Sequence, residues 1–341
     1  MKNYILFVAG GSGGHITPAI AVALKLNKKD VFFICSKSDL DKNIIKKYDF
    51  KYKQISTGKL RRYFDWQNFL DIGRLSWGLV ESFLFLVFNR PRVIFSKGGF
   101  VSLPVGISAF LLRIPFVLHE SDSIMGLANR ILSRLSNQKL SAFQIQDATE
   151  VGTPIRQDAQ KADPKKANDF LNFKYKKPIL LVIGGSQGSS FINNLIKNQL
   201  KNLKSFNIVI IKGKNQLNLK NSDSIRIFDF LYDEFFDVLN VSDFVISRSG
   251  ANSIAEIAYF KKPAILIPLK NSANNHQYLN AKNLQKQKLC LMLTEDEVEK
   301  NLQKTIKKLQ ENKELFSKNI SKLSSNESAE KIAKIIKKYI G

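Results

Sequence analysis

The chain has 341 residues, a length that accommodates two ordinary domains, each with its own core. Apolar residues make up 44% of it and charged residues 24%, which excludes an intrinsically disordered chain. The formal net charge of +24 points to anionic partners such as nucleic acid, lipid headgroups or phosphorylated substrates. A lysine-rich coding bias explains the same charge equally well, so composition alone leaves the partner open.

Neither the cysteines nor the apolar runs indicate export or a membrane span. Cys35 and Cys290 lie far apart and show no metal-ligand spacing, which fits a reducing compartment. The apolar start of the chain runs into glycines instead of a signal cleavage site. The best apolar stretch, Gly78 to Phe88, contains Glu81 and is shorter than the ~20 residues that span a bilayer. We therefore expect a protein that stays in the cytoplasm and does not cross the membrane.

Short β-branched and aromatic runs alternate with longer amphipathic stretches along the chain. Strands that are apolar on nearly every residue predict parallel sheets covered on both faces, which is the doubly wound α/β architecture. In chain order, strands are expected at Tyr4–Ala9, Val31–Cys35, Arg92–Ser96, Pro115–His119, Ile179–Ile183, Asn207–Lys212, Asp243–Ser247 and Ala264–Ile267.

The same order of elements occurs twice, because the first strand ends in the turn GGSGGH and the strand Ile179–Ile183 ends in GGSQGSS. Two Rossmann-like halves are therefore predicted, residues 1–155 and 156–324. A linker-like segment, from Gly152 to Lys177, follows the last strand of the first half. A helix over 325–341 is expected to bury one face, which carries Ile332, Ile335, Ile336 and Tyr339.

The glycine turns match neither common nucleotide motif. A dinucleotide fingerprint starting at Gly11 needs a glycine where Ile16 stands, and neither turn continues into Gly-Lys-Ser/Thr. Their glycines still let N–H groups face an anion at a helix start, which we expect at Thr17 as the cap and Pro18 as the first helical residue. A third such turn, SKGGFVSLP, should bring Gly98 and Gly99 to the same sheet edge.

Two interpretations of Ser253 and Glu256 stay open. Their spacing is that of a capping box for a helix beginning near Ser253, which would give Glu256 a purely structural role. A carboxylate at a helix start also suits the two hydroxyls of a ribose, with the Ser253 hydroxyl and adjacent amides on phosphate.

The three histidines show no spacing that indicates a shared metal ion. His15 lies in the first glycine turn, where an imidazole can exchange protons near neutral pH. His119 ends a strand and is expected to be a hydrogen-bonded core residue, while His276 is expected to cap or orient the segment HQYLNA.

Seven segments, taken in order, resemble the MurG family of glycosyltransferases of bacterial cell-wall synthesis: GGSGGHITPAIAVA, SKGGFVSLP, HESDSIMGLANR, GTPIR, GGSQGS, SRSGANSIAEIA and NNHQYLNA. Each segment alone is weak evidence, but seven with matching order and spacing are specific. The resemblance implies a GT-B fold, two Rossmann-like domains facing a cleft. It implies inverting transfer of N-acetylglucosamine from UDP-N-acetylglucosamine to the muramyl-pentapeptide of lipid I, giving lipid II for peptidoglycan.

The resemblance also implies what each half binds. The N-terminal half, joined by the C-terminal helix, would meet the lipid acceptor at the cytoplasmic face of the cell membrane, as a peripheral protein. The C-terminal half would hold the donor, with Glu256 on ribose and Ser253 near the phosphates. Matched donor-binding positions are Ser12, Gly13, Gly14, Arg156, Ser186, Leu231, Ala251, Asn252, Ser253, Ile254, Ala255, Glu256 and Gln277, with Asp122 the weakest match because many relatives have asparagine there.

The implied reaction is a single displacement without a covalent enzyme intermediate. His15 is the first candidate for the base that takes the acceptor proton, and Glu120 is the alternative. Helix N-termini with Ser186 and Ser253 would stabilise the departing diphosphate, so no cofactor and no metal is expected. The expected partners are UDP-N-acetylglucosamine, lipid I, the anionic inner-leaflet surface and a cell-wall synthesis complex, but no nucleic acid.

The segment WQNFLDIGRLSWGLVESFLFLVFNRPR has two interpretations. Its apolar and aromatic residues, flanked by Arg74, Arg90 and Arg92, suit a membrane-surface patch, and they suit a buried core helix equally well. Rival functions are another GT-B enzyme that uses a UDP-sugar, either a diacylglycerol glycosyltransferase or a UDP-sugar epimerase. A nucleic-acid-binding protein would explain the charge, but no matching motif is present.

Overall fold

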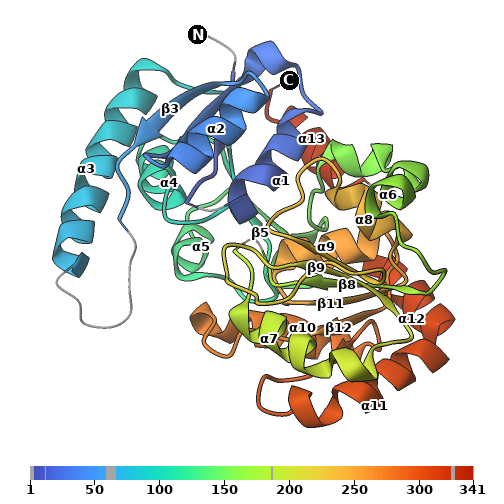
Figure 1. Ribbon diagram of the computed structural model, residues 1–341. Coiled ribbons are helices and arrows are strands. Elements are labelled where there is room, and N and C mark those ends of the chain that lie inside the picture. Colours follow the sequence, from blue (N-terminus) through green and yellow to red (C-terminus); the bar gives the residue numbers. More distant parts are fainter. Residues whose placement is uncertain (1–3, 12, 59–66, 186, 324–326, 341) are drawn as a thin grey trace. The chain divides into compact units, whose positions relative to one another are not determined.

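The computed structural model describes residues 4–11, 13–58, 67–185, 187–323 and 327–340 (Figure 1). The chain divides into two compact units, the first formed by Met1–Arg156 with Asn326–Gly341 and the second by Gln157–Ser325. The boundary expected after residue 155 lies next to this division.

The first unit is built on a seven-stranded parallel sheet of order β3-β2-β1-β4-β5-β6-β7. Chain order reverses between β1 and β4, and ligands of open α/β sheets bind beyond the carboxyl ends of strands at such a reversal. The strands are β1 (Ile5–Val8), β2 (Val31–Ser36), β3 (Lys51–Ile55), β4 (Val93–Ser96), β5 (Phe116–Glu120), β6 (Gln138–Ser141) and β7 (Thr149–Glu150). The helical segments are α1 (Gly13–Ala23), η1 (Lys28–Asp30), α2 (Asp39–Lys47), α3 (Gln67–Phe88), α4 (Ser102–Leu111), α5 (Leu127–Leu132) and α13 (Ser328–Lys337).

Both faces of this sheet are buried, which explains why β1 is apolar at every position. Ile5 and Phe7 belong to the core beneath α1 and α13, whereas Leu6 and Val8 belong to the core beneath α3 and α4. This alternation is the period of two that places successive side chains on opposite faces of a sheet. The first half therefore has the predicted doubly wound architecture.

The last helix, α13, belongs to the first unit although it follows the second in sequence, and it lies beside α1 (Figure 1). Ile332 and Ile336 are fully buried in the core under α1, and Glu330 forms an ion pair of 2.9 Å with Lys25. The helix thus buries one face, as its pattern predicts.

The second unit repeats the design with a six-stranded parallel sheet of order β10-β9-β8-β11-β12-β13. Here the reversal lies between β8 and β11. Its strands are β8 (Ile179–Ile183), β9 (Asn207–Ile211), β10 (Ile225–Phe228), β11 (Phe244–Ser247), β12 (Ala264–Leu266) and β13 (Leu291–Met292). Its helical segments are η2 (Gln157–Lys161), α6 (Pro164–Leu171), α7 (Ser190–Gln199), η3 (Leu200–Asn202), α8 (Phe235–Val241), α9 (Ala251–Tyr259), η4 (Ala273–Asn275), α10 (His276–Lys286), α11 (Val298–Glu311), α12 (Lys313–Ile320) and η5 (Ser321–Leu323).

The segment from Gly152 to Lys177, predicted to be a linker, belongs mostly to the second unit. The segment holds η2 and α6, and α6 packs against α8 within the second unit. Asp163 caps α6 by accepting a hydrogen bond from the backbone of Lys165, with Pro164 at the first helical position. Asp163 and Pro164 are typical of a helix start, but the many charged residues around them favoured a linker.

The apolar helix α3 packs on α4, yet much of its surface stays exposed. Gly78, Ser82 and Leu86 face inward, and close packing at Gly78 brings the backbone of Ser56 against the helix. Among the described residues, no helix is both long and apolar enough to cross a bilayer. The outward residues of α3, here called the α3 patch, are Ile72, Trp77, Val80, Phe83, Leu84, Val87 and Phe88, which are 36% to 80% exposed.

Candidate active site

His15 lies in the first turn of α1, at the edge of the first sheet where β1 and β4 end. Its Nδ1 lies 3.2 Å from the carbonyl oxygen of Lys97. A carbonyl only accepts hydrogen bonds, so this contact assigns the proton to Nδ1 and leaves Nε2 as the acceptor nitrogen. Burial first, and then the charge of Lys97, hold the pKa of His15 below its usual value, against Asp122 and Asp41. The imidazole ring is therefore neutral, and its Nε2 can accept a proton.

Gly99 gives the His15 ring its space. A β-carbon at Gly99 would lie 3.3 Å from Cδ2 and 3.5 Å from Nε2 of that ring, and the residue has a φ of 84°. Gly98 also has a positive φ, and a β-carbon there would overlap the Asn129 amide at 2.6 Å. Both positions need glycine, because other residues rarely adopt this backbone conformation. The turn after β4 thus reaches the same sheet edge as His15, as predicted.

Glu120 is held within the turn that follows β5. Its carboxylate accepts hydrogen bonds from the backbone of Ser121 at 2.7 Å, Asp122 at 3.0 Å and Gly126 at 3.1 Å. The Asn129 amide donates a further bond of 2.8 Å. Burial raises the pKa of Glu120 despite these bonds. A carboxylate engaged by four donors organises the turn.

His119 is a hydrogen-bonded core residue, as predicted. Its Nε2 donates to the carbonyl oxygen of Gly152 at 2.9 Å, and its Nδ1 lies 2.7 Å from the ammonium nitrogen of Lys97. Burial holds the pKa of His119 well below its usual value. The side chain is fully buried and structural.

The first glycine turn is only partly available to an anion. The Gly11 N–H donates to the buried carboxylate of Asp41 at 2.8 Å, so that group does not face a phosphate. Ser12 lies outside the described residues. Gly13 and Gly14 lie in the first turn of α1, which begins five residues before Pro18, the expected first helical residue. That prediction is wrong because the helix admits Pro18 in its second turn.

In the second unit, the turn between β8 and α7 has glycines of positive φ at Gly185 and Gly188. Ser189 caps α7 by accepting a hydrogen bond of 3.3 Å from the backbone of Ile192. Ser186 lies outside the described residues. The glycine turn followed by a capped helix N-terminus is the arrangement that binds phosphate in other α/β proteins.

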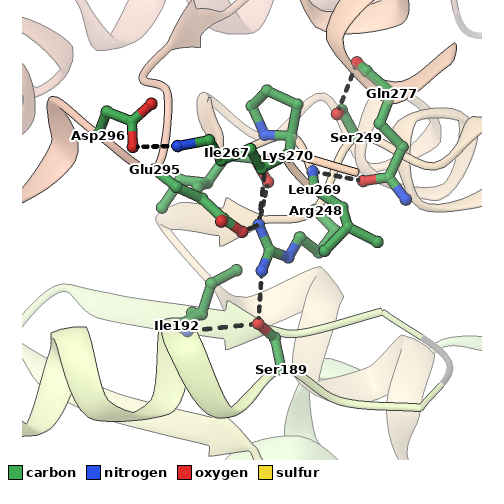
Figure 2. A network of polar contacts seen from close by, with 11 residues as sticks. Ser189, Ile192, Arg248, Ser249, Ile267, Leu269, Lys270, Gln277, Glu295 and Asp296 are labelled. Carbon is green, nitrogen blue, oxygen red and sulfur yellow. Dashed lines mark hydrogen bonds and ion pairs between the residues drawn. The ribbon is translucent and has the colours of Figure 1, made fainter. Parts of the chain in front are cut away.

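Arg248, directly after β11, connects the turns at this edge of the second sheet (Figure 2). Its guanidinium donates to Ser189 Oγ at 2.8 Å and to the carbonyl oxygens of Ile267 and Pro268 at 3.2 and 3.1 Å. It also forms an ion pair of 2.5 Å with Glu295, and it is 5% exposed. The sequence analysis missed this residue. The only sequence feature that could have indicated it is a charged residue between the apolar strand β11 and the helix α9.

Helix α9 begins at Ala251 with Gly250 as its N-cap, without a side-chain capping bond. The prediction that Ser253 starts the helix is therefore wrong, and Ser253 and Glu256 do not form a capping box. Glu256, in the second turn, cannot cap the helix start, so the capping interpretation fails. Ala251 and Ile254 are buried, whereas Asn252, Ser253, Ala255 and Glu256 are partly exposed.

Gln277 and Ser249 are joined across the same edge (Figure 2). The Ser249 hydroxyl donates to the Gln277 carbonyl oxygen at 2.8 Å, and Gln277 Oε1 accepts from the backbone of Leu269 at 3.1 Å. These bonds align the start of α10 with the turn that precedes α9. His276 begins α10 and bonds the Ala273 carbonyl oxygen at 2.6 Å, as expected of an orienting residue.

The remaining predicted positions lie farther along their sheets or at the unit boundary. Leu231 is half-buried in the turn between β10 and α8, at the outer strand of the second sheet. Arg156 is the last residue of the first segment of unit one and is partly exposed. Among the described residues, no group of three or more His, Cys, Asp or Glu could hold a metal ion.

Each half of the chain matches a known domain model. Residues 5–140 match the glycosyltransferase family 28 N-terminal domain, and residues 179–338 match the glycosyltransferase family 28 C-terminal domain. Among solved structures, MurG from Acinetobacter baumannii has a TM-score of 0.76 at 22% identity, covering 98% of this chain and 99% of that one. A UDP-GlcNAc 2-epimerase from Neisseria meningitidis has a TM-score of 0.67 at 13% identity, covering 99% and 100%. The GT-B fold alone therefore does not separate a transferase from an epimerase.

Sequence identity does separate them. Relatives from Clostridium tetani and Clostridium botulinum are 37% and 39% identical to this chain, covering 99% and 98% of it and 99% of each relative. Both are named UDP-N-acetylglucosamine–N-acetylmuramyl-(pentapeptide) pyrophosphoryl-undecaprenol N-acetylglucosamine transferase. With both family 28 domains present and this identity over nearly its whole length, the chain belongs to the MurG family of glycosyltransferases.

Proposed function

We propose that this protein transfers N-acetylglucosamine from UDP-N-acetylglucosamine to the muramyl-pentapeptide of lipid I and so makes lipid II for peptidoglycan. The observation that carries the proposal is the identity of 37% to 39%, over nearly the full chain, with relatives named for this transfer. An epimerase or a diacylglycerol glycosyltransferase would share the donor half but would not need the turns around His15 and Glu120.

In the proposed reaction, the first unit binds the acceptor and the second unit binds the donor. The acceptor hydroxyl attacks the anomeric carbon while the bond from that carbon to the diphosphate oxygen breaks, so configuration inverts. The hydroxyl proton passes to His15 Nε2, the nitrogen that the Lys97 contact leaves without a proton. The electron pair of the broken bond leaves with UDP.

The donor side is proposed from the edge of the second sheet. Glu256 would accept hydrogen bonds from the ribose hydroxyls, and Gln277 would contact the sugar. Leu231 would meet uracil through its backbone. The N-termini of α7 and α9, with Ser186 and Ser253, would stabilise the leaving diphosphate, and Arg156 would contact the donor. Arg248, which lies just before α9, connects that turn to the start of α7 through Ser189 and to the turn after β12 through Ile267 and Pro268.

The test is a transfer assay with the purified protein. Labelled UDP-N-acetylglucosamine and lipid I should give lipid II, whereas UDP-glucose, or a diacylglycerol as acceptor, should give little product. Activity should persist in EDTA. Absence of product with lipid I would contradict the proposed acceptor. Epimerised UDP-sugar formed without lipid I would contradict transfer as the reaction. Transfer that EDTA abolishes and a divalent cation restores would contradict metal independence.

We also propose that the α3 patch holds the protein on the cytoplasmic face of the membrane. The exposure of this helix supports the proposal, because Trp77 is 59% exposed and Phe88 is 80% exposed. Arg74, Arg90 and Arg92 are exposed nearby in sequence and suit anionic headgroups. Exposed apolar side chains with adjacent cations are the usual composition of an interfacial helix.

Vesicle sedimentation tests this placement with a matched pair of variants. Leu84 in the α3 patch and Leu315 in α12 are exposed leucines, at 50% and 49%. Leu84→Glu should weaken binding to anionic vesicles several-fold because it places a charge among lipid acyl chains. Leu315→Glu should leave binding unchanged. Equal effects of the two variants, or no preference for anionic lipid at low salt, would count against this surface.

A further inference from the structure

Lys97 is a fully buried lysine that the proposed reaction has not used. It follows β4 at the reversal point of the first sheet, and its N–H donates to the Val8 carbonyl oxygen at 3.0 Å. Its ammonium group lies 2.7 Å from His119 Nδ1 and donates to the Ser121 hydroxyl. Its carbonyl oxygen is the partner of His15 Nδ1. One residue thus contacts the end of β1, the start of α1 and the turn after β5.

The contacts that hold the buried ammonium group of Lys97 are to neutral groups, His119 Nδ1 and the Ser121 hydroxyl. Glu120 and Asp122 lie close enough to raise its pKa, but burial outweighs them and lowers that pKa to about 7. Burying an ammonium group is costly, and an apolar side chain would fill the same space without that cost. The hydrogen bonds of this group must therefore offset a cost that an apolar side chain would not have.

The contacts of His119 show how the ammonium group is held. The Gly152 carbonyl oxygen takes the Nε2 proton of His119, so Nδ1 is the acceptor that faces Lys97. Ser121 supplies a second acceptor from the turn that Glu120 organises. The ammonium group is therefore fixed relative to the turn after β5, while the backbone of the same residue is fixed relative to His15.

We propose that Lys97 is a positioning residue for the transfer reaction, which joins these turns and holds His15 with Nε2 as a proton acceptor. This inference rests on the proposed function, in which His15 is the base. Lys97 acts on His15 in two ways: its carbonyl oxygen selects the tautomer, and its charge disfavours protonation of the ring. The other charged groups that act on His15 are Asp122 after β5 and Asp41 in α2, and both act in the opposite direction.

The experiment combines histidine NMR with kinetics. The chain has three histidines, so ¹⁵N-histidine labelling can resolve the titration and tautomer of His15. Lys97→Met keeps the backbone carbonyl but removes the charge, and should raise the pKa of His15 by roughly one unit. The acid limb of the pH profile of kcat/KM should move upward by the same amount, with lower turnover at neutral pH.

Lys262→Met is the matched control. Lys262 is a half-buried lysine of the second unit whose pKa is also lowered by burial, and it donates to the Asn240 carbonyl oxygen at 2.6 Å. This variant removes a partly buried ammonium group of the other unit, whereas the charged groups that shift the pKa of His15 belong to the first unit, so the His15 titration and the acid limb should stay as in the wild type. If Lys97→Met does not fold, Ser121→Ala removes one acceptor of the ammonium group and should shift His15 in the same direction.

The outcomes separate this inference from the proposed function. An unchanged His15 titration in folded Lys97→Met or Ser121→Ala overturns the inference, even if transfer is normal. A shifted titration with an unchanged acid limb overturns the role of Lys97 in the reaction and removes His15 as the base. If the wild type shows no transfer at all, the proposed function fails, while the NMR titration still decides whether Lys97 controls the state of His15.

Discussion

His15 owes its proposed chemistry to a hydrogen bond and a glycine. The bond to the Lys97 carbonyl oxygen leaves Nε2 as acceptor, and Gly99 leaves space beside that nitrogen. His15→Gln preserves a donor for the carbonyl oxygen but cannot take a proton. We expect turnover to fall by roughly 10²- to 10⁴-fold with donor affinity nearly unchanged. Steady-state kinetics with a donor titration checks this, and wild-type turnover would exclude His15 as the base.

Glu256 offers a cleaner test than its sequence pattern indicated, because it does not cap α9. Glu256→Gln should weaken donor binding by roughly 10- to 100-fold, the loss of a hydrogen bond to a charged group. The melting temperature should barely change. Glu299→Gln, in the first turn of α11, is a control for losing a helical carboxylate. A lower melting temperature with normal donor affinity would show that Glu256 has a structural role only.

At the residue level, sequence reasoning found the chemically distinctive side chains and missed the buried charges. His15 and His119 stood out because histidines are few, and one lies in a glycine turn and the other at the end of a predicted strand. Lys97 and Arg248 did not, since lysine and arginine are abundant here and nothing local to either residue indicates burial. Their partners, such as Ser121 for Lys97 and Glu295 for Arg248, come from distant turns that only the fold brings together.

At the level of elements, Arg248 connects three turns of the second sheet, so its replacement should destabilise the second unit. Arg248→Met leaves Glu295 without its cation and Ser189 without one of its hydrogen bonds. We expect a loss of about 3–5 kcal/mol in the free energy of unfolding of the second unit, with weaker donor binding. Urea unfolding checks this.

The double variant is the control for this prediction. Adding Glu295→Gln to Arg248→Met removes the uncompensated charge and should recover part of the lost stability. No recovery would mean that the hydrogen bonds to Ser189, Ile267 and Pro268, and not the ion pair, account for the effect.

Strands that are buried on both faces were predicted from the sequence, whereas polar, less buried or two-residue strands were missed. The central strands, such as β1 and β8, are buried on both faces and were predicted as continuous apolar runs. The missed strands are the four edge strands and β6, which is polar: β3 is KYKQI with alternating exposure, β10 is IRIF and only partly buried, and β7 and β13 have two residues each. Helix starts were misplaced at α1 and α9, because both begin beside glycines whose backbone conformation leaves little trace in side-chain pattern.

For the whole molecule, the buried histidines predict a specific response to acid. Burial lowers the pKa of His119 and His15, so below about pH 6.5 the unfolded chain binds protons that the folded first unit does not. Stability should therefore fall as pH drops from about 6.5 through the folded-state pKa values. The His119→Asn variant should be less stable than the wild type at neutral pH, but its free energy of unfolding should fall less on acidification. Calorimetry from pH 7.5 to 5 measures how the stability of each protein changes with pH. The same pH dependence in the variant and the wild type would contradict this account.

The placement of α13 has a consequence for how the protein is made. The core beneath α1 includes Ile332 and Ile336, which leave the ribosome only after the entire second unit has been synthesised. The second unit is continuous in sequence and can close as soon as it emerges, whereas the first must wait with an apolar surface uncovered. Synthesis and folding thus run in opposite order here. A chain that stalls late in translation would present a finished second unit attached to a first unit that chaperones still recognise.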